Sequence, residues 1–453
     1  MKYFFLLLPL FGLSSCFSTA QAQQSAILDE YVRSGLVNNL ALQQQDFDLQ
    51  KSREAVRQAR SLFYPVISFN ASYTRALGGR NTSLPIGDLL NPVYTTLNQI
   101  TQSGAFPQVE NQKIQFLPDN FQETKVKFAY PLFNSDLRYN RQIQEQLYES
   151  KSAQKVAYEQ ELHYQITEAY LRYVQALEAE KVWGNAKVVL TELRRFNESL
   201  VKNNVATRDV VATADYELSK ADNEIYQLRS SQNTARAYFN FLINKDLQNA
   251  VVVDTALLRP TRSTYQLADL LQQALANRAE FTALRAGLAA AGTDVKRNDA
   301  NRKLPDFYLG GEFGFQGYGY HFSGDQAYAL AQVGLTYDLY DAGQRKSKTQ
   351  VARLENEKIR TQLTQVQQQI ALQITRNWND LEAARNTYTT TQTGLRAAEE
   401  TFRIVNNKYR ASQVLLIEFL QAQNRVTTAR LQSTLAWMDI LLKEAALRQA
   451  AGW

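Results

Sequence analysis

The chain has 453 residues, of which 45% are hydrophobic and 21% charged, and its formal net charge at pH 7 is +6. Lysine and arginine alternate with aspartate and glutamate along the chain, which is typical of solvated helix faces and excludes an obvious nucleic-acid site. Cys16 is the only cysteine, which excludes an intramolecular disulfide and a cysteine metal cluster, and His163 and His321 lie too far apart in sequence to predict a metal site.

An export signal is predicted at residues 1–22. Lys2 supplies a positively charged start, Tyr3 to Leu13 form an apolar run of 11 residues, and Ala20-Gln21-Ala22 is a small-residue cleavage site. The apolar run is too short to span a bilayer, which takes about 20 residues, and no other run approaches that length. The mature chain is therefore expected to begin at Gln23.

The same stretch permits a second processing route. Leu13-Ser14-Ser15-Cys16 resembles a bacterial lipobox, in which Cys16 is acylated and becomes the first residue. Both routes take the chain out of the cytoplasm. Sequence alone leaves both open, although the cleavage site at Ala22 favours the plain signal.

An internal repeat organises the rest of the chain. The segment Val126–Asn134 matches Val333–Asp341 at an offset of 207 residues. Each copy reads helix, strand, loop, strand, long helix, turn, helix. The sequence therefore predicts two copies of one unit with a linking segment between them: 23–242, 243–265 and 266–453.

Long helices are predicted in both copies. No proline lies between Pro131 and Pro260 or after Pro305, and stretches rich in Gln, Ala, Leu, Glu and Lys without breakers are strong helix formers. Residues 137–201 alone predict one helix about 97 Å long. Apolar residues in it recur at spacings of three and four, which indicates helices packed side by side.

Four segments alternate apolar and polar residues with the period of a β-strand, namely 64–75, 123–134, 306–319 and 328–340. Segments of about ten residues with one apolar face and aromatic ends are typical of transmembrane β-barrels. Four strands cannot close a barrel, and open strand edges in lipid leave backbone groups unsatisfied. The barrel is therefore expected to be shared between chains, and three copies would supply about 12 strands.

The first two strands are separated by a long insertion, residues 76–122, with four prolines and two glycine-rich spots. Transmembrane barrels keep long loops outside the cell and short turns on the periplasmic side. We therefore expect this insertion to cap the extracellular mouth. Within it a short amphipathic piece is predicted, built from Leu89, Leu90, Val93, Tyr94 and Leu97.

The order of these features resembles one known family. The strand-to-helix signatures Pro131-Leu132-Phe133-Asn134 and Asp338-Leu339-Tyr340-Asp341-Ala342-Gly343, together with the late stretch Tyr409–Gln423, are similar to those of the TolC-like outer membrane factors. The resemblance covers about residues 27–448. It implies a trimer with a 12-stranded outer-membrane barrel, a long periplasmic α-barrel, and an equatorial α/β band drawn from residues 243–265 and the C-terminus.

The resemblance also implies a periplasmic gate where the helix pair of the second copy turns. Glu418 falls on the first acidic position of the gate, and Gln421 stands where a second carboxylate is usual. Tyr409 matches a tyrosine of the hydrogen-bonding latch, whereas Val414 replaces an arginine of it. Asp209 is the counterpart of Glu418 in the first copy.

The helix-pair turns depart from the family pattern. Asn203 and Ser412 occupy the places of the family's turn glycines. Asparagine adopts the left-handed conformation more readily than most residues, so the first turn is the better preserved of the two.

The resulting functional prediction is a passive duct that is not an enzyme. No nucleotide-binding or catalytic motif is present, and Gly310–Gly319 alternates glycines with aromatics inside a strand pattern instead of opening a helix. Driving energy would therefore come from a partner, and the resemblance implies an inner-membrane pump reached through a periplasmic adaptor. A periplasmic coiled-coil adaptor or structural protein is the alternative, against which the four alternating segments argue. An exported enzyme with a helical domain is a third class, and it lacks a catalytic site.

Overall fold

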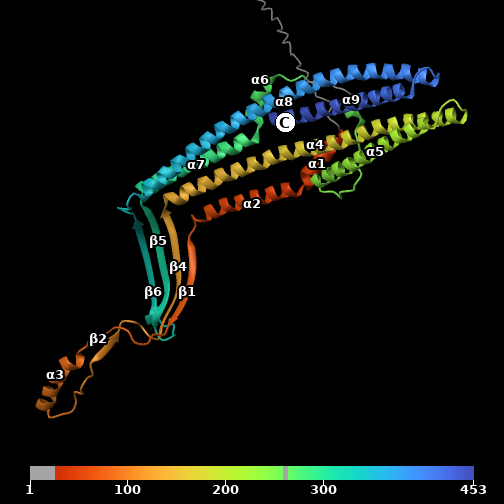
Figure 1. The fold of residues 1–453 in the computed structure, drawn as a ribbon. Coiled ribbons are helices and arrows are strands. Elements are labelled where there is room, and N and C mark those ends of the chain that lie inside the picture. The colour runs from red at the N-terminus through yellow and green to blue at the C-terminus, as the bar shows by residue number, and fades with distance from the viewer. Residues whose placement is uncertain (1–25, 259–263) are drawn as a thin grey trace, which may run out of the picture. The chain divides into compact units, whose positions relative to one another are not determined.

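The structure is a computed structural model that describes residues 26–258 and 264–453. The predicted export signal, Cys16 and residues 259–263 of the linking segment lie outside this range. The described elements are shown in Figure 1. In chain order they are α1 (Ala26–Asn38), α2 (Leu40–Ser61), β1 (Val66–Thr74), β2 (Asn81–Leu84), α3 (Ile86–Thr101), β3 (Gln112–Gln115), β4 (Phe121–Phe133), α4 (Ser135–Lys202), α5 (Asp209–Leu242), η1 (Thr255–Leu258), α6 (Leu267–Asn277), α7 (Ala279–Lys303), β5 (Asp306–Tyr318), η2 (Gly324–Gln326), β6 (Ala327–Thr336), α8 (Gln344–Arg410) and α9 (Leu416–Ala451).

The chain folds into two compact units, and each unit contains segments from both halves of the sequence. We call them the helical unit and the sheet unit. The helical unit comprises described residues up to Lys51, Glu149–Gly287 and Ile359–Trp453. The sheet unit comprises Ser52–Tyr148 and Leu288–Lys358.

The same order of elements occurs twice along the chain. Apart from β2, α3 and β3, the series helix, helix, strand, strand, long helix, helix runs from α1 to α5 and again from α6 to α9. The sequence predicted one helix before the first strand of each copy, whereas the structure has two. The breaks fall at Asn39 and Arg278. Asn39 caps α2, because its Oδ1 accepts the backbone N–H of Leu42 at 2.9 Å.

The helices predicted to be long are continuous. α4 has 68 residues and α8 has 67, so each is about 100 Å long. α4 runs antiparallel to α5 and α8 to α9 (Figure 1). Ion pairs bridge each pair of helices, for example Arg229 to Glu180 at 2.7 Å and Lys443 to Asp380 at 3.3 Å.

A four-stranded antiparallel sheet with the order β1-β4-β5-β6 forms the centre of the sheet unit. A strand is present at each of the four predicted positions. β6 is shorter than expected and ends at Thr336 instead of residue 340. The remaining residues turn into α8, where the Asp341 carboxylate accepts the backbone N–H groups of Gly343 and Arg345. Within this sheet β1 and β6 are the two edge strands.

The sheet has one apolar and one polar face. The strand register places Phe69, Val126, Phe313 and Ala329 in one row across the sheet. The apolar side chains are strongly exposed, since Phe69 is 70% and Phe313 60% accessible. No described helix of this chain therefore covers that face.

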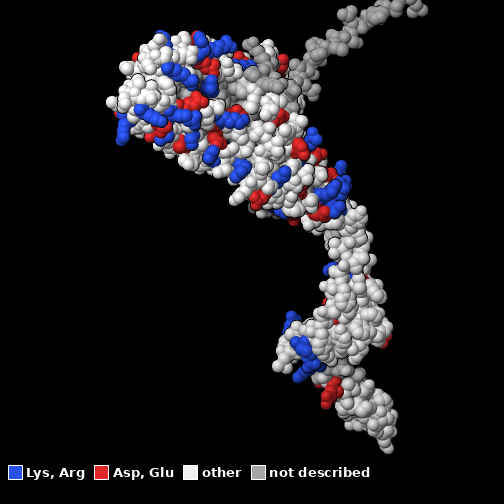
Figure 2. Space-filling model, turned by 90° about the vertical axis from the view of Figure 1, so that its right-hand side faces the viewer, with Lys and Arg blue, Asp and Glu red and all other residues white. Residues whose placement is uncertain are grey.

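Charged residues are confined to the opposite face of the sheet. Lys125 lies between Glu123 at 2.7 Å and Glu312 at 3.0 Å, and Lys127 reaches Glu312 at 3.2 Å. On the side seen in Figure 2, the sheet is mostly white, whereas Lys, Arg, Asp and Glu interleave over the helical unit. On the polar face, a β-carbon at Gly334 would meet the ring of Tyr308, which would have to move aside.

The insertion between β1 and β4 is more ordered than the predicted loop. Its strands β2 and β3 pair with each other, and the helix α3 lies in the connection between them. The predicted amphipathic piece is thus a helix of 16 residues. The flanking polar stretches could not be predicted as strands, because four-residue strands such as Asn81–Leu84 show too few alternations to be recognised.

The core of the helical unit includes a group of aromatic side chains beside residues 243–258. The fully buried side chains of Tyr170 and Phe239 contact Tyr31 from α1. Tyr170 Oη donates a hydrogen bond to the carbonyl of Val252 at 3.1 Å and accepts one from the N–H of Asp254 at 2.8 Å. Burial raises the pKa of Tyr170 to about 12. Residues 252–254 are therefore held against the helices by the buried hydroxyl of Tyr170.

Candidate functional site

One turn joins α4 to α5, and a matching turn joins α8 to α9. Each turn contains one residue in the left-handed conformation. Ser412 has φ of 58° and Asn204 has φ of 61°. The hydrogen bonds from Val205 N to Leu200 O and from Gln413 N to Lys408 O, both 2.9 Å, close the same helix-ending motif in the two turns. The prediction for Ser412 agrees with this geometry. In the first turn, the left-handed residue is Asn204 and not the predicted Asn203.

A buried hydrogen bond links the two helix pairs just before the second turn. The Tyr409 hydroxyl donates to Oδ1 of Asn197 at 2.8 Å, and Nδ2 of Asn197 donates to the carbonyl of Val210 at 2.9 Å. Asn197 is fully buried. One asparagine on α4 therefore connects the end of α8 to the start of α5. We call Tyr409 and Asn197 the latch.

Aromatic side chains surround the latch. Tyr409 packs against Phe196 at 5.7 Å and Phe419 at 5.1 Å between ring centroids. Burial raises the pKa of Tyr409, although its hydrogen bond to Asn197 acts in the opposite direction. Val414, the residue in place of the family's arginine, joins this apolar cluster. The second turn is thus held by packing where the family pattern has a charge.

The predicted acidic residues lie at the starts of the short helices. Glu418 is in the first turn of α9 and Asp209 in the first turn of α5, where the partial positive charge of a helix N-terminus favours a carboxylate. Asp209 accepts a hydrogen bond from the Thr207 hydroxyl. Glu418 and Gln421 are both exposed, and Glu418 makes no ion pair with the rest of the described chain. Glu418 is next to Phe419, which contacts the latch.

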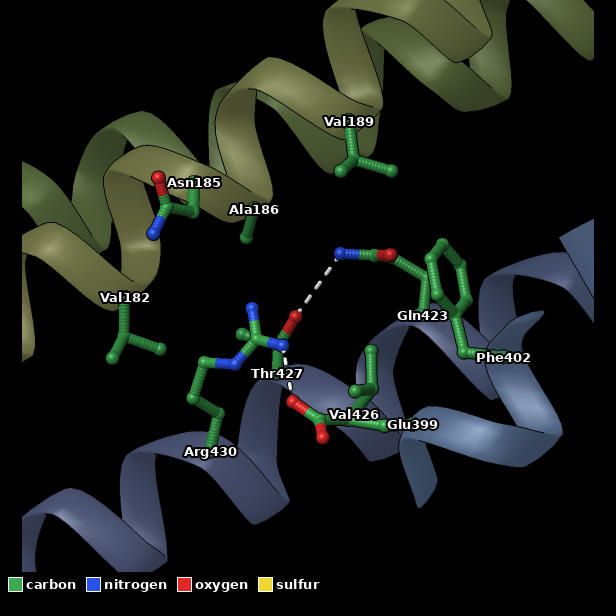
Figure 3. A pocket seen from close by; sticks show the side chains of 10 residues that line it. All are labelled: Val182, Asn185, Ala186, Val189, Glu399, Phe402, Gln423, Val426, Thr427 and Arg430. Atoms are coloured by element: carbon green, nitrogen blue, oxygen red, sulfur yellow. Dashed lines mark hydrogen bonds and ion pairs between the residues drawn. The ribbon is translucent and has the colours of Figure 1, made fainter. Parts of the chain in front are cut away.

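A small cavity lies between α4, α8 and α9 (Figure 3). Its volume is about 210 Å³, and an Arg430–Glu399 ion pair lies at one side of it. Gln423 is 3% exposed; its Nε2 donates to Thr427 Oγ1 at 3.1 Å, and its Oε1 has no partner among the described residues. The roles of Gln423 and Asn197 could not be predicted from the sequence, because a polar residue inside a long helix carries no local signal that it is buried.

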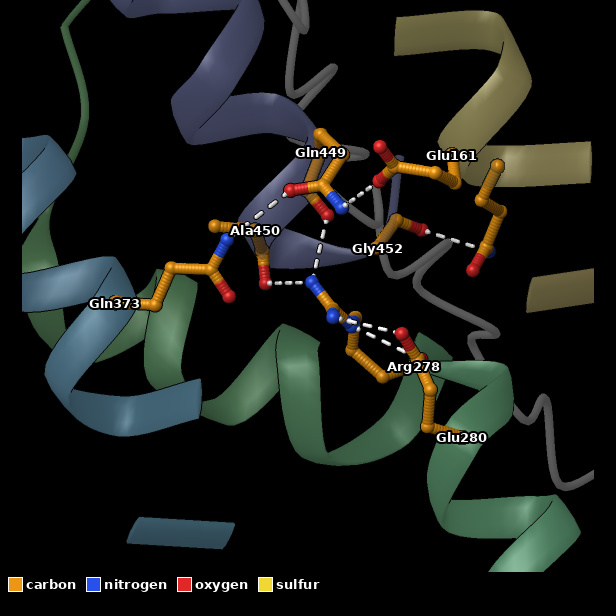
Figure 4. Close-up of polar contacts among 8 residues, drawn as sticks. Glu161, Arg278, Glu280, Gln373, Gln449, Ala450 and Gly452 are labelled. Carbon is orange, nitrogen blue, oxygen red and sulfur yellow. Dashed lines mark hydrogen bonds and ion pairs between the residues drawn. The ribbon is translucent and has the colours of Figure 1, made fainter. Parts of the chain in front are cut away.

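A second polar cluster holds the end of α9 (Figure 4). Nη1 of the buried Arg278 donates to the carbonyls of Gln449 at 3.0 Å and Ala450 at 3.2 Å, and Arg278 also pairs with Glu280 at 2.7 Å. At the corresponding break, Nδ2 of Asn39 donates to the carbonyl of Leu242 at the end of α5, at 2.8 Å. Both breaks in the long helical stretches are therefore fixed to the end of a neighbouring helix.

The described residues contain no group of three or more His, Cys, Asp or Glu side chains placed to hold a metal ion. None of the helices in the described range has the length and apolarity required to cross a membrane.

The chain is similar in sequence to known outer membrane efflux proteins. Residues 270–453 match the family model described as "Outer membrane efflux protein". A curated relative, the outer membrane efflux protein BepC of Brucella suis biovar 1, is 23% identical over 304 residues. That match covers 65% of this chain and 64% of the relative, so it spans less than two thirds of the relative's length.

Solved outer-membrane channels have the same fold. VceC of Vibrio cholerae superposes with a TM-score of 0.75 at 17% identity, over 95% of this chain and 97% of that one. CmeC of Campylobacter jejuni gives 0.77 at 14% identity, over 94% and 86% of the two chains. The resemblance to the TolC-like outer membrane factors is confirmed. A third TolC-like channel, MtrE of Neisseria gonorrhoeae in its open state, gives 0.74 at 16% identity, over 94% and 89%.

Proposed function

We propose that this chain is a passive exit duct in the outer membrane of a Gram-negative bacterium, extending into the periplasm. The observation that carries the proposal is the four-stranded sheet, with its exposed apolar face and its two unpaired edges at β1 and β6. In water both features are unfavourable, whereas in lipid a closed barrel satisfies the edges and covers the apolar face. Three copies would supply about 12 strands, which is enough for a pore.

The proposed partners are proteins that would supply the energy for transport. A duct with no nucleotide-binding motif depends on an inner-membrane pump, reached through a periplasmic adaptor, as in a tripartite efflux or type I secretion system. The long helices would form the α-barrel that extends toward these partners. Residues 243–265 and the C-terminal end would form its equatorial band. The alternative, a periplasmic adaptor or structural protein, leaves the exposed apolar face of the sheet without a role.

The gate is proposed at the second helix-pair turn. The latch of Tyr409 and Asn197 would hold the two helix pairs together in the closed state, because its hydrogen bonds join α8, α4 and α5. Threefold symmetry would bring three Glu418 side chains together at the constriction, with Gln421 one turn farther along α9. Asp209, on the other pair, would contribute less.

The assembly is the direct test of this proposal. The full-length protein, extracted from outer membranes in detergent, is expected to be a trimer by light scattering coupled to size exclusion. Its bands in SDS gels should shift on heating, as those of closed barrels do. A monodisperse monomer that retains its β-structure contradicts the proposal, since four lipid-facing strands have no way to close.

The substitution Glu418→Gln is expected to weaken cation selectivity and divalent-cation block of the closed trimer. Three carboxylates close together in a narrow pore attract cations, and the amide keeps their shape without the charge. Single-channel recording of reconstituted trimers measures both properties. Asp209→Asn, the same change at the corresponding position, is the matched control and should have a smaller effect. Equal effects would mean that the constriction lies elsewhere.

A further inference from the structure

The helix α3 is fixed to its own loop along one face. Asn91 exchanges two hydrogen bonds with the backbone of Val109, at 3.0 and 2.8 Å, and Asn98 exchanges two with the backbone of Phe106, at 2.8 and 3.1 Å. A β-carbon at Gly87 would collide with the carbonyl of Val109. The loop backbone at Val109 therefore lies directly against α3, and this face of the helix is covered by the loop of its own chain.

A different face of α3 is apolar and uncovered. Leu89 is 70%, Val93 51% and Ile100 73% exposed. At 100° per residue these three side chains fall within about 40° of one another around the helix. The face held by Asn91 and Asn98 begins roughly 140° beyond them. We call Leu89, Val93 and Ile100 the outer stripe.

The composition of α3 argues against a lipid headgroup as the occupant of the outer stripe. Helices that lie on anionic membrane surfaces carry lysine and arginine beside their apolar face. Residues 86–101 contain neither, and Asp88 is their one charged residue. The tip of the insertion, at the bottom of Figure 2, is white on the side shown. An uncharged protein surface is the better match.

The position of α3 in the chain indicates which protein supplies that surface. The insertion starts directly after β1, an edge strand of the sheet that needs a neighbouring strand. We propose that the outer stripe packs against the insertion of a second copy of this chain, so that the α3 helices of a ring form an apolar cap beyond the barrel. This inference rests on the proposed function, because closure of the β1 and β6 edges between copies brings the insertions around one axis.

Cysteine crosslinking tests the contact in the intact protein. Val93→Cys lies on the outer stripe, and Gln99→Cys is an exposed control on the same helix, about 120° away. After oxidation in outer membranes, Val93→Cys is expected to give at least about ten times more covalent dimer than Gln99→Cys, because a disulfide needs β-carbons about 4 Å apart. The unmodified chain controls for Cys16.

A second reagent identifies the occupant. A benzophenone maleimide on Val93→Cys should attach, on illumination, to the α3 segment of another copy. Attachment to lipopolysaccharide or to an unrelated protein overturns the inference. So does a trimer in which Val93→Cys crosslinks no better than Gln99→Cys, and this result leaves the proposed duct intact. A monomeric protein overturns both the inference and the duct.

Discussion

Substituting Val333→Arg is expected to abolish the heat-modifiable trimer in outer-membrane fractions. Val333 is 69% exposed on β6, on the same face as Phe313 and Phe69. If that face contacts lipid, an arginine near the bilayer midplane costs about 2–4 kcal/mol per chain, and the three copies of a trimer carry the cost together. On a solvated sheet, the same substitution changes stability by less than about 0.5 kcal/mol. Quantifying the trimer in fractionated membranes distinguishes the two.

The neighbouring residue supplies the control for this substitution. Gln332 is also exposed, but its side chain lies on the opposite face of the same strand, the face that carries Lys125 and Glu312. Gln332→Arg introduces the same charge into a polar surface and should leave trimer formation near the wild-type level. If Gln332→Arg and Val333→Arg reduced the trimer equally, lipid contact on the apolar face would be the wrong explanation.

The second large effect is expected at the latch. Tyr409→Phe removes the hydroxyl that donates to Asn197, which leaves a fully buried side-chain carbonyl oxygen without this donor in the proposed closed state. An unsatisfied buried polar group costs about 1–3 kcal/mol, so the open state should become about 5 to 150 times more populated relative to the closed one. Single-channel recording of reconstituted trimers measures this as a rise in open probability.

A matched control and a double-mutant cycle define the latch further. Tyr216→Phe removes an equivalent hydroxyl from a side chain that is 69% exposed on α5, and it should leave opening unchanged. Combining Tyr409→Phe with Asn197→Ala should raise the open probability by less than the product of the two single effects, because both remove the same hydrogen bond. Independent effects, with the trimer intact, would mean that the hydrogen bond between Tyr409 and Asn197 does not stabilise the closed state.

The long helices and the strand positions could be predicted because each depends on a pattern within one segment. Residues 135–202 contain no proline, and the alternation in β1, β4, β5 and β6 is a period of two that a helix does not produce. Ser412 was assigned to the second turn from the family resemblance and not from a local pattern, and the structure has a left-handed residue at that position.

The missed features depend on residues that are distant in sequence. The helix breaks at Asn39 and Arg278 form where these side chains reach the ends of α5 and α9, about 200 and 170 residues later. The Asn197 side chain is paired with Tyr409, 212 residues away. Contacts between residues so far apart produce no periodic pattern in the sequence. The one-residue error between Asn203 and Asn204 has a different cause, because two adjacent asparagines are equally suited to the left-handed conformation.

The order of strands in the sheet has a consequence for biogenesis. β5 and β6 are joined by a short connection and can pair as soon as both have been synthesised, whereas β4 must wait for β5, with Val126 opposite Phe313. Closing so long a loop is entropically costly, and contacts between distant residues form slowly. Local helix pairs such as α4 with α5 are complete earlier. In the proposed trimer, a newly exported subunit would therefore complete its helix pairs before its sheet, and the open edges at β1 and β6 would be satisfied only when it meets its sister subunits.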